Sequence, residues 1–291
     1  MQMSSSTLFG FVEGFSDRYI YSRVVDDTCA SRNIKYEIVT AEELPGQAGG
    51  KTALLSFFDY AKRATLLRND LQGKRTVSLF FLDKDVDDIF RRRRRSSHVV
   101  YTRTYDIEGT LFRFADVARA AAGASCLDLN STRVALGSSS LWCRKAASAW
   151  IEWVKLCLVA CTCAPKAGSY YSRPVSQIHP GPYSPIDQAE LAKHRSALAA
   201  ASGLSAAKFK LVCDKIDRLV SKAFAEGAYD RFFRGKWYPA LLRADVQRIA
   251  AGRRCNLSNF ADRVISCLAE NADYNSAWTQ PYRAAVVGLL S

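Results

Sequence analysis

Two short apolar runs that end directly in acidic residues are the strongest constraint on the fold. One covers residues 8–12 and is followed by Glu13, and the other covers residues 77–82 and is followed by Asp83 and Asp85. Continuous apolar runs of this length are typical of strands buried on both faces, as in a parallel sheet. Acids that follow such strands lie at the carboxyl edge of the sheet, where open α/β folds place their active sites. The sequence therefore predicts an α/β fold with an acidic site at this edge.

Strand-like and helix-like segments alternate through the first third of the chain, which predicts a mostly parallel sheet flanked by helices. Strands are expected at residues 8–12, 35–39, 77–82 and 98–101, and helices at residues 17–30, 51–67 and 108–122. After about residue 125 the pattern is helical, and helices are expected at residues 142–163, 188–201, 206–225, 238–251 and 257–271. We therefore predict an α/β catalytic domain, residues 1–125, and a mostly helical region, residues 126–291, that packs on it and contributes to substrate binding.

The charge of the chain restricts its partners. The chain has 291 residues, and 41 lysines and arginines against 28 aspartates and glutamates leave a net charge of +13. Such a balance favours polyanions, nucleic acid first and anionic membrane second. No apolar stretch reaches the roughly 20 residues of a transmembrane helix, and the N-terminus lacks the basic region of a signal peptide. We therefore expect a cytoplasmic protein without a membrane partner.

The nine cysteines are spread along the chain, unlike those of a short disulfide-rich scaffold. Cys157, Cys161 and Cys163, with Cys143 upstream, leave structural zinc as one possibility. Zinc sites usually contain C-x2-C pairs, and no second pair or nearby histidine completes this group. Cys157 and Cys161 are one helical turn apart, which favours the simpler interpretation, a shared buried helix face.

Four acids make the predicted sheet edge a candidate metal site. Asp83, Asp85 and Asp87 point to the same side if the chain stays extended, because side chains alternate along a strand. Glu13 approaches from the other strand. Converging carboxylates repel each other unless a cation lies among them. A hard divalent cation such as magnesium takes oxygen ligands and commonly brings phosphates with it.

Four short motifs resemble the TOPRIM domain, which occurs in topoisomerases, primases and nucleases of the overcoming-lysogenization-defect (OLD) family. They are FVEGFSD at residues 11–17, GGK at residues 49–51, LDKD at residues 82–85 and YDIEGTL at residues 105–111. The arrangement is most similar to stand-alone TOPRIM effectors of bacterial anti-phage systems of the PARIS type. The close match covers about residues 8–115, and the rest of the chain is only loosely similar, chiefly at residues 235–237.

The resemblance implies a nuclease that hydrolyses phosphodiester bonds with one or two Mg²⁺ or Mn²⁺ ions. The implied metal ligands are Glu13, Asp83, Asp85, Asp87 as a reserve ligand, and Glu108 for a second ion. Lys236 is the implied cation that faces the developing negative charge. The resemblance also implies a toxic effector of antiviral defence, an ATPase partner that restrains or triggers it, and a homodimer.

A run of arginines follows the acids almost at once. Arginine binds phosphate through two parallel hydrogen bonds, and a lysine at a glycine-rich helix start can hold a phosphate as well. We therefore expect contacts to nucleic acid, either DNA or tRNA, from Lys51, Arg91, Arg92, Arg93, Arg94 and Arg95.

Two other functions stay open. An apolar strand that ends in Asp83-Lys84-Asp85 also resembles the nucleophile motif of haloacid-dehalogenase phosphatases, in which Asp83 would carry the phosphoryl group. That interpretation leaves Glu13 and Glu108 unexplained. The second is a non-catalytic basic adaptor that binds nucleic acid or a protein partner and merely retains an acidic cleft.

Overall fold

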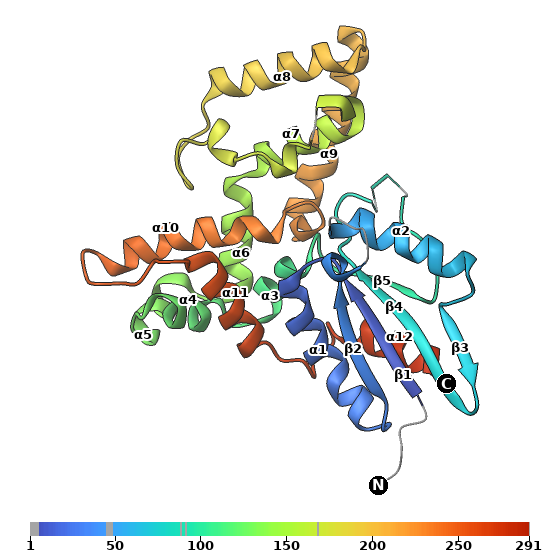
Figure 1. Ribbon diagram of the computed structural model, residues 1–291. Helices are drawn as coiled ribbons and strands as arrows, with labels where there is room; N and C mark the ends of the chain where they lie inside the picture. The colour runs from blue at the N-terminus through green and yellow to red at the C-terminus, as the bar shows by residue number, and fades with distance from the viewer. Residues whose placement is uncertain (1–5, 45–48, 88, 91, 168, 291) are drawn as a thin grey trace. The chain divides into compact units, whose positions relative to one another are not determined.

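The structure is a computed structural model that describes residues 6–44, 49–87, 89–90, 92–167 and 169–290 of the chain. It divides into two compact units (Figure 1). The first comprises Met1–Thr110 together with Ala272–Ser291, and the second comprises Leu111–Asn271. The division therefore falls after Thr110, not at the predicted boundary after residue 125, and the last segment of the chain belongs to the first unit.

The first unit contains a five-stranded mixed sheet. Its strands are β1 (Ser6–Val12), β2 (Lys35–Thr40), β3 (Arg68–Leu71), β4 (Lys74–Leu82) and β5 (Val99–Tyr101). The order is β2-β1-β4-β3, and β5 also pairs with β4. The pairs β1–β2, β1–β4 and β4–β5 are parallel, and only β3 and β4 pair antiparallel. The predicted α/β class with a mostly parallel sheet is confirmed.

Strand β3 was not predicted, and the helix expected at residues 51–67 ends earlier. Helix α2 (Gly50–Arg63) stops before Thr65, which has a φ of 57°. Gln72 and Gly73 then connect β3 to β4 with φ values of 50° and 74°. Two consecutive residues with positive φ form the type of hairpin turn whose twist matches that of the flanking strands.

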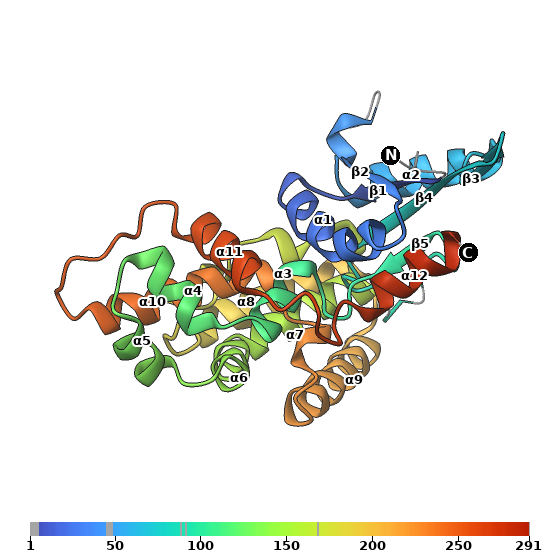
Figure 2. The same cartoon turned by 90° about the horizontal axis from the view of Figure 1, so that it is seen from below.

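Helices cover both faces of the sheet (Figure 2). Adjacent side chains of β4 point to opposite faces: the Phe80 ring packs against Phe58 of α2, whereas the Phe81 ring stacks on Tyr21. Tyr21 belongs to α1 (Phe15–Ala30), and Tyr282 of α12 (Gln280–Leu290) packs beside it on the same face. The final helix therefore joins the first unit because its apolar side completes one face of the sheet.

Gly10 is packed where β1 passes between its two neighbours. A Cβ atom at this position would lie 2.5 Å from Ile38 Cδ1 and 3.1 Å from Phe81 Cε2, and both side chains are buried. We expect Gly10→Ala to lower the free energy of unfolding by about 1 to 2 kcal/mol through overpacking. Urea denaturation measures this. Gly288→Ala is the control, because no atom lies within 4 Å of its added Cβ and the substitution should be neutral or slightly stabilising.

The second unit is helical, as predicted for the later part of the chain. Its α-helices are α4 (Val117–Ser125), α5 (Leu129–Leu136), α6 (Ser139–Ala149), α7 (Ile151–Cys163), α8 (Gln188–Ser202), α9 (Ala206–Ala225), α10 (Tyr238–Ala250) and α11 (Phe260–Asn271). Helix α3 (Ile107–Phe114) begins in the first unit and ends in the second. The 3-10 helices of the chain are η1 (Ala41–Glu43), η2 (Pro165–Ala167), η3 (Tyr170–Ser172), η4 (Val175–Gln177), η5 (Tyr229–Arg231) and η6 (Gly235–Trp237).

Two long helices of the prediction are broken in the structure. The helix expected at residues 108–122 is interrupted at Asp116, whose side chain accepts a hydrogen bond from Arg119 N–H and starts α4. The helix expected at residues 142–163 is interrupted at Trp150, between α6 and α7. Among the described residues no single helix is long and apolar enough to cross a membrane. Within the described ranges, one pair of helices, α6 and α7, meets the requirements of length and composition together, but it is bent by 63°.

Candidate metal centre

The carboxyl edge of the sheet brings Glu13 and Asp83 together. Phe11 of β1 pairs with Phe80 of β4, so the residues that follow the two strands leave the sheet side by side. The backbone N–H of Asp83 donates a hydrogen bond of 2.7 Å to Glu13 Oε1. Asp83 Oδ1 in turn accepts a hydrogen bond of 3.0 Å from the N–H of Ile107, the first residue of α3. The predicted meeting of the two acids at this edge therefore occurs.

The backbone conformation that brings Asp85 and Asp87 to the site differs from the predicted one. Asp85 has a φ of 48°, and the N–H of Asp87 bonds to the carbonyl oxygen of Lys84 at 3.1 Å, so the chain turns after Asp83. The expected alternation along an extended chain is therefore wrong. The ammonium of Lys51 gathers the two acids: its Nζ lies 3.0 Å from Asp85 Oδ2 and 2.6 Å from Asp87 Oδ2.

Three further acids are buried and act on Asp83 through their charges: Asp17, Asp106 and Glu108. Asp17 Oδ2 accepts the N–H of Gly14 at 3.0 Å, and Asp106 Oδ1 accepts the N–H of Gly109 at 2.9 Å. Each of these two contacts stabilises the first turn of a helix. Glu108 lies in the first turn of α3.

The electrostatics of the cluster show an excess of negative charge. Burial raises the pKa of Asp83 well above its ordinary value, and the charges of Glu13, Glu108, Asp106 and Asp17 raise it further. Burial likewise raises the pKa of Glu13 from 4.5 to about 8; Lys51 and the Asp83 N–H oppose this shift, whereas Asp85 and Asp17 add to it. The cluster therefore retains protons near neutral pH, and a divalent cation could replace them.

The donor set suits magnesium or manganese in chemistry, because every candidate ligand offers carboxylate oxygens. The side chains as they lie do not converge on one point, however. In the described part of the chain, no group of three or more His, Cys, Asp or Glu side chains is arranged to hold a metal ion. One oxygen of Glu13 and one of Asp83 accept backbone N–H groups, and Lys51 holds Asp85 and Asp87. A divalent ion bound through the oxygens of Asp85 and Asp87 that Lys51 contacts would compete with Lys51 for them.

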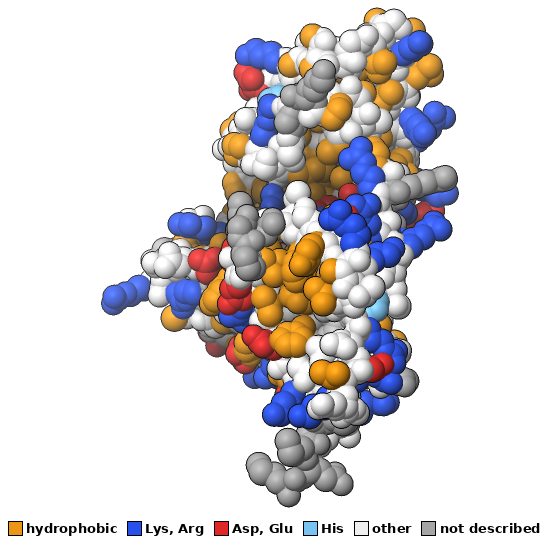
Figure 3. Space-filling view, turned by 45° about the vertical axis from the view of Figure 1, so that its right-hand side comes forward, with side chains coloured by type: hydrophobic (Ala, Val, Ile, Leu, Met, Phe, Trp, Pro, Cys, Tyr) orange, Lys and Arg blue, Asp and Glu red, His pale blue; other side chains and the backbone are white. Residues whose placement is uncertain are grey.

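The basic segment beside the acids is exposed. The side chains of Arg92, Arg93, Arg94 and Arg95 face solvent, and Arg91 lies outside the described residues. Arg94 forms an ion pair of 2.9 Å with Asp59 of α2, and its N–H bonds to the Tyr101 hydroxyl at 2.8 Å. The Arg93 guanidinium lies 5.5 Å from the centre of the Tyr101 ring. Lysine and arginine side chains are spread widely over the face of the molecule that Figure 3 shows.

Two predicted groups lie apart from the acidic cluster in the sequence and belong to the second unit. Lys236 is exposed in η6, and its predicted role stays a prediction. Cys143 and Cys157 are buried thiols, and burial raises the pKa of both. Cys161 is partly exposed on the same helix as Cys157. The described residues contain no group arranged for zinc among these cysteines.

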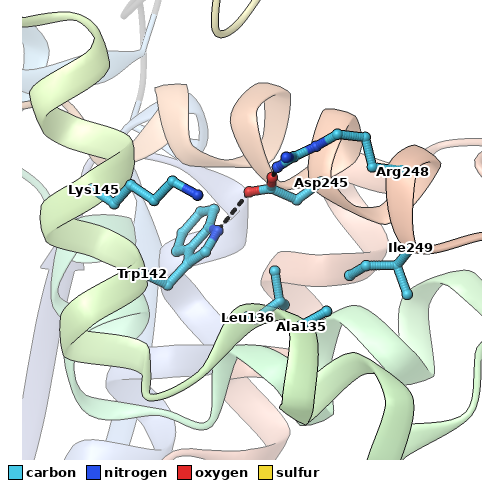
Figure 4. A pocket seen from close by; sticks show the side chains of 7 residues that line it. All are labelled: Ala135, Leu136, Trp142, Lys145, Asp245, Arg248 and Ile249. Carbon is cyan, nitrogen blue, oxygen red and sulfur yellow. Dashed lines mark hydrogen bonds and ion pairs between the residues drawn. The ribbon is translucent and has the colours of Figure 1, made fainter.

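Asp245 is a buried acid of the second unit that the sequence analysis did not identify. Its Oδ2 accepts hydrogen bonds from Trp142 Nε1 at 2.7 Å and from the Tyr183 hydroxyl at 2.6 Å, and its Oδ1 pairs with Arg248. It lines a cavity of about 260 Å³ between α5, α6 and α10 (Figure 4). Because each carboxylate oxygen has a partner, we interpret Asp245 as a structural link between α6, α10 and the segment that carries Tyr183.

Removing this link should destabilise the second unit. We expect Asp245→Ala to lower the free energy of unfolding by about 2 kcal/mol, since it leaves the Trp142 N–H without its acceptor in the interior. Asp245→Asn keeps one acceptor oxygen and should lose less. Urea denaturation followed by tryptophan fluorescence measures both. Equal effects of the two substitutions would show that the hydrogen bonds are not the cause.

The fold and the site define a class of protein: an α/β protein with buried carboxylates clustered at the carboxyl edge of a mixed sheet. Comparison of the chain with protein-family models and with curated proteins found no match. The resemblance to TOPRIM nucleases therefore rests on the four sequence motifs, and the evidence for function lies in the site itself.

Proposed function

We propose that the protein is a metal-dependent nuclease with a TOPRIM-like catalytic domain. The observation that carries the proposal is the pairing of Glu13 and Asp83 at the carboxyl edge, where burial first and neighbouring acids second raise the pKa of both side chains. Carboxylates with strongly raised pKa values are a common property of sites that bind metal ions or transfer protons. The exposed arginines of residues 92–95 supply the complementary surface for a phosphate backbone.

The proposed ligands of one or two Mg²⁺ or Mn²⁺ ions are Glu13, Asp83, Asp85, Asp87 and Glu108. Bound ions of this type lower the pKa of a coordinated water and neutralise charge on the phosphate. Glu13 and Asp83 hold their oxygens in place through the hydrogen bonds that join β1, β4 and α3. The arginines orient the nucleic acid through its backbone, which carries no base preference.

The wider setting is proposed from the resemblance alone. It comprises a cytoplasmic effector of an anti-phage system, an ATPase partner that restrains or triggers the nuclease, and a homodimer. Lys236 is proposed as the cation that stabilises the developing charge.

The direct test is cleavage of nucleic acid by the purified protein. We expect supercoiled DNA, single-stranded DNA or tRNA to be cut in the presence of Mg²⁺ or Mn²⁺ and left intact in a chelator. Glu13→Gln should abolish cleavage, whereas Glu37→Gln, which changes an exposed glutamate of the neighbouring strand β2, should not. Nucleic-acid binding without any metal-dependent product would favour the non-catalytic adaptor instead. The same cleavage assay is then repeated with the proposed ATPase partner added.

A further inference from the structure

Lys51 contacts the acidic edge of the sheet at three oxygen atoms. Its Nζ donates hydrogen bonds to the carbonyl oxygen of Asp83 at 2.5 Å and to Asp85 Oδ2 at 3.0 Å, and it lies 2.6 Å from Asp87 Oδ2. An ammonium group has three protons, so these three oxygens use all of its hydrogen-bonding capacity. The side chain is only 15% exposed. In this conformation Lys51 cannot also bind the backbone of a nucleic acid, which was its predicted role.

The backbone before Lys51 favours this position. Helix α2 begins after Gly49 and Gly50, whose φ values are 90° and 75°. Residues with side chains rarely adopt these angles, and a Cβ at Gly49 would also lie 2.9 Å from the side chain of Glu42. The two glycines therefore let the chain turn sharply and place Lys51 at the carboxyl edge of the sheet.

We propose that Lys51 is a displaceable internal cation, which neutralises Asp85 and Asp87 in the metal-free protein and leaves them when a divalent ion binds. This inference rests on the proposed function, since it assumes that the acids bind metal. An ammonium and a divalent ion at the same carboxylate oxygens repel each other strongly, because their like charges lie only a few ångströms apart.

The surroundings of Lys51 indicate where it goes. Its Nζ lies 5.7 Å from the centre of the Tyr101 ring, and Arg93 lies 5.5 Å from the same centre. The displaced ammonium therefore lies close to the exposed arginines and becomes available to a phosphate of the substrate. Metal and nucleic acid would then each favour the binding of the other. The metal takes Asp85 and Asp87 from Lys51, and a phosphate of the nucleic acid takes Lys51 from the two acids.

The first test measures metal affinity by calorimetry. Mn²⁺ is titrated into the wild type, Lys51→Met and Lys51→Arg at neutral pH without nucleic acid. Removal of the competing charge should tighten Mn²⁺ binding about tenfold in Lys51→Met. Lys51→Arg keeps the charge and should bind about as the wild type does. Equal or weaker binding by Lys51→Met would overturn the proposal, because Lys51 would then support the ligands instead of competing for them.

The second test uses only the wild type, so it does not depend on a variant that folds. Lysines are reductively methylated with and without Mn²⁺, and the extent at each position is read by mass spectrometry. Lys51 should react slowly without Mn²⁺ and faster with it, whereas Lys193 and Lys210, which are 70% and 74% exposed, should react equally in both. Mn²⁺ binding with no change in the reactivity of Lys51 would overturn the proposal for Lys51 but not the proposal of a nuclease. If calorimetry detects no Mn²⁺ binding by the wild type, Lys51→Met or Lys51→Arg, both proposals are overturned.

Discussion

Asp83→Asn will reduce metal-dependent cleavage by about 1,000-fold or more while the protein still folds. Asparagine keeps an oxygen that can accept the N–H of Ile107 at the position of Asp83 Oδ1, so the link to α3 survives. The backbone N–H of residue 83 also stays in place as the donor to Glu13. What is lost is one negative charge and one carboxylate oxygen at the centre of the cluster. The measurement is the single-turnover rate with saturating Mn²⁺, together with circular dichroism of both proteins.

The control for this prediction is Asp262→Asn, which makes the same chemical change at an exposed position of α11 and should leave the rate unchanged. The comparison with Glu13→Gln decides between two chemistries. A nuclease that uses both acids as ligands loses activity in either variant. A phosphatase with an Asp83 nucleophile would lose turnover in Asp83→Asn but not in Glu13→Gln, and it would act on small phosphomonoesters. Cleavage above about a tenth of the wild-type rate in Asp83→Asn would rule out a ligand role for this residue.

The part of the site that could be predicted from the sequence follows from strand burial. A strand buried on both faces must be apolar throughout, so the first acid after it marks the edge of the sheet. Glu13 and Asp83 obey this rule, and the 2.7 Å bond between them follows from the parallel pairing of β1 with β4. Strands β1, β2, β4 and β5 lie where the sequence predicts strands, to within a few residues at their ends.

The features that sequence analysis missed depend on turns and on distant contacts. Strand β3 is short and exposed, and its pairing is set by the turn at Gln72 and Gly73. Helix α12 joins the sheet because Tyr282 packs against Tyr21 and Phe81, more than 200 positions away in the chain. No local pattern contains that information. The inward position of Lys51 likewise depends on the turn at Asp85, whose positive φ overrides the expected alternation.

The stability of the metal-free protein will fall as the pH rises from about 4.5 to about 8. The pKa of Glu13 is raised from 4.5 to about 8 in the folded chain, chiefly by burial, and that of Asp83 is raised as well. Between these values the folded state binds more protons than the unfolded state, so each increase in pH favours unfolding. Because Glu13 is only partly buried, we expect a loss on the order of 3 kcal/mol across the window. Urea denaturation at a series of pH values in a chelator measures it.

Other groups titrate in the same range, and a variant separates their contributions. Burial lowers the pKa of His179 and of His194, so these residues make stability increase with pH, opposite in sign to Glu13. Glu13→Gln leaves the histidines unchanged and should flatten the decline, with a more stable metal-free protein at pH 8 than the wild type. An unchanged slope in Glu13→Gln would assign the decline to another group.

Divalent ions should reverse the decline in the wild type. A metal binds the deprotonated carboxylates, and protons compete with it, so Mg²⁺ or Mn²⁺ should stabilise the protein more at pH 8 than at pH 5. The effect should be absent from Glu13→Gln, because the cluster then lacks a ligand and part of its excess charge. This result would connect the raised pKa of Glu13 to metal binding without any assay of activity. If divalent ions stabilise the wild type equally at both pH values, the acids are a strained but purely structural cluster, and the nuclease proposal loses its physical basis.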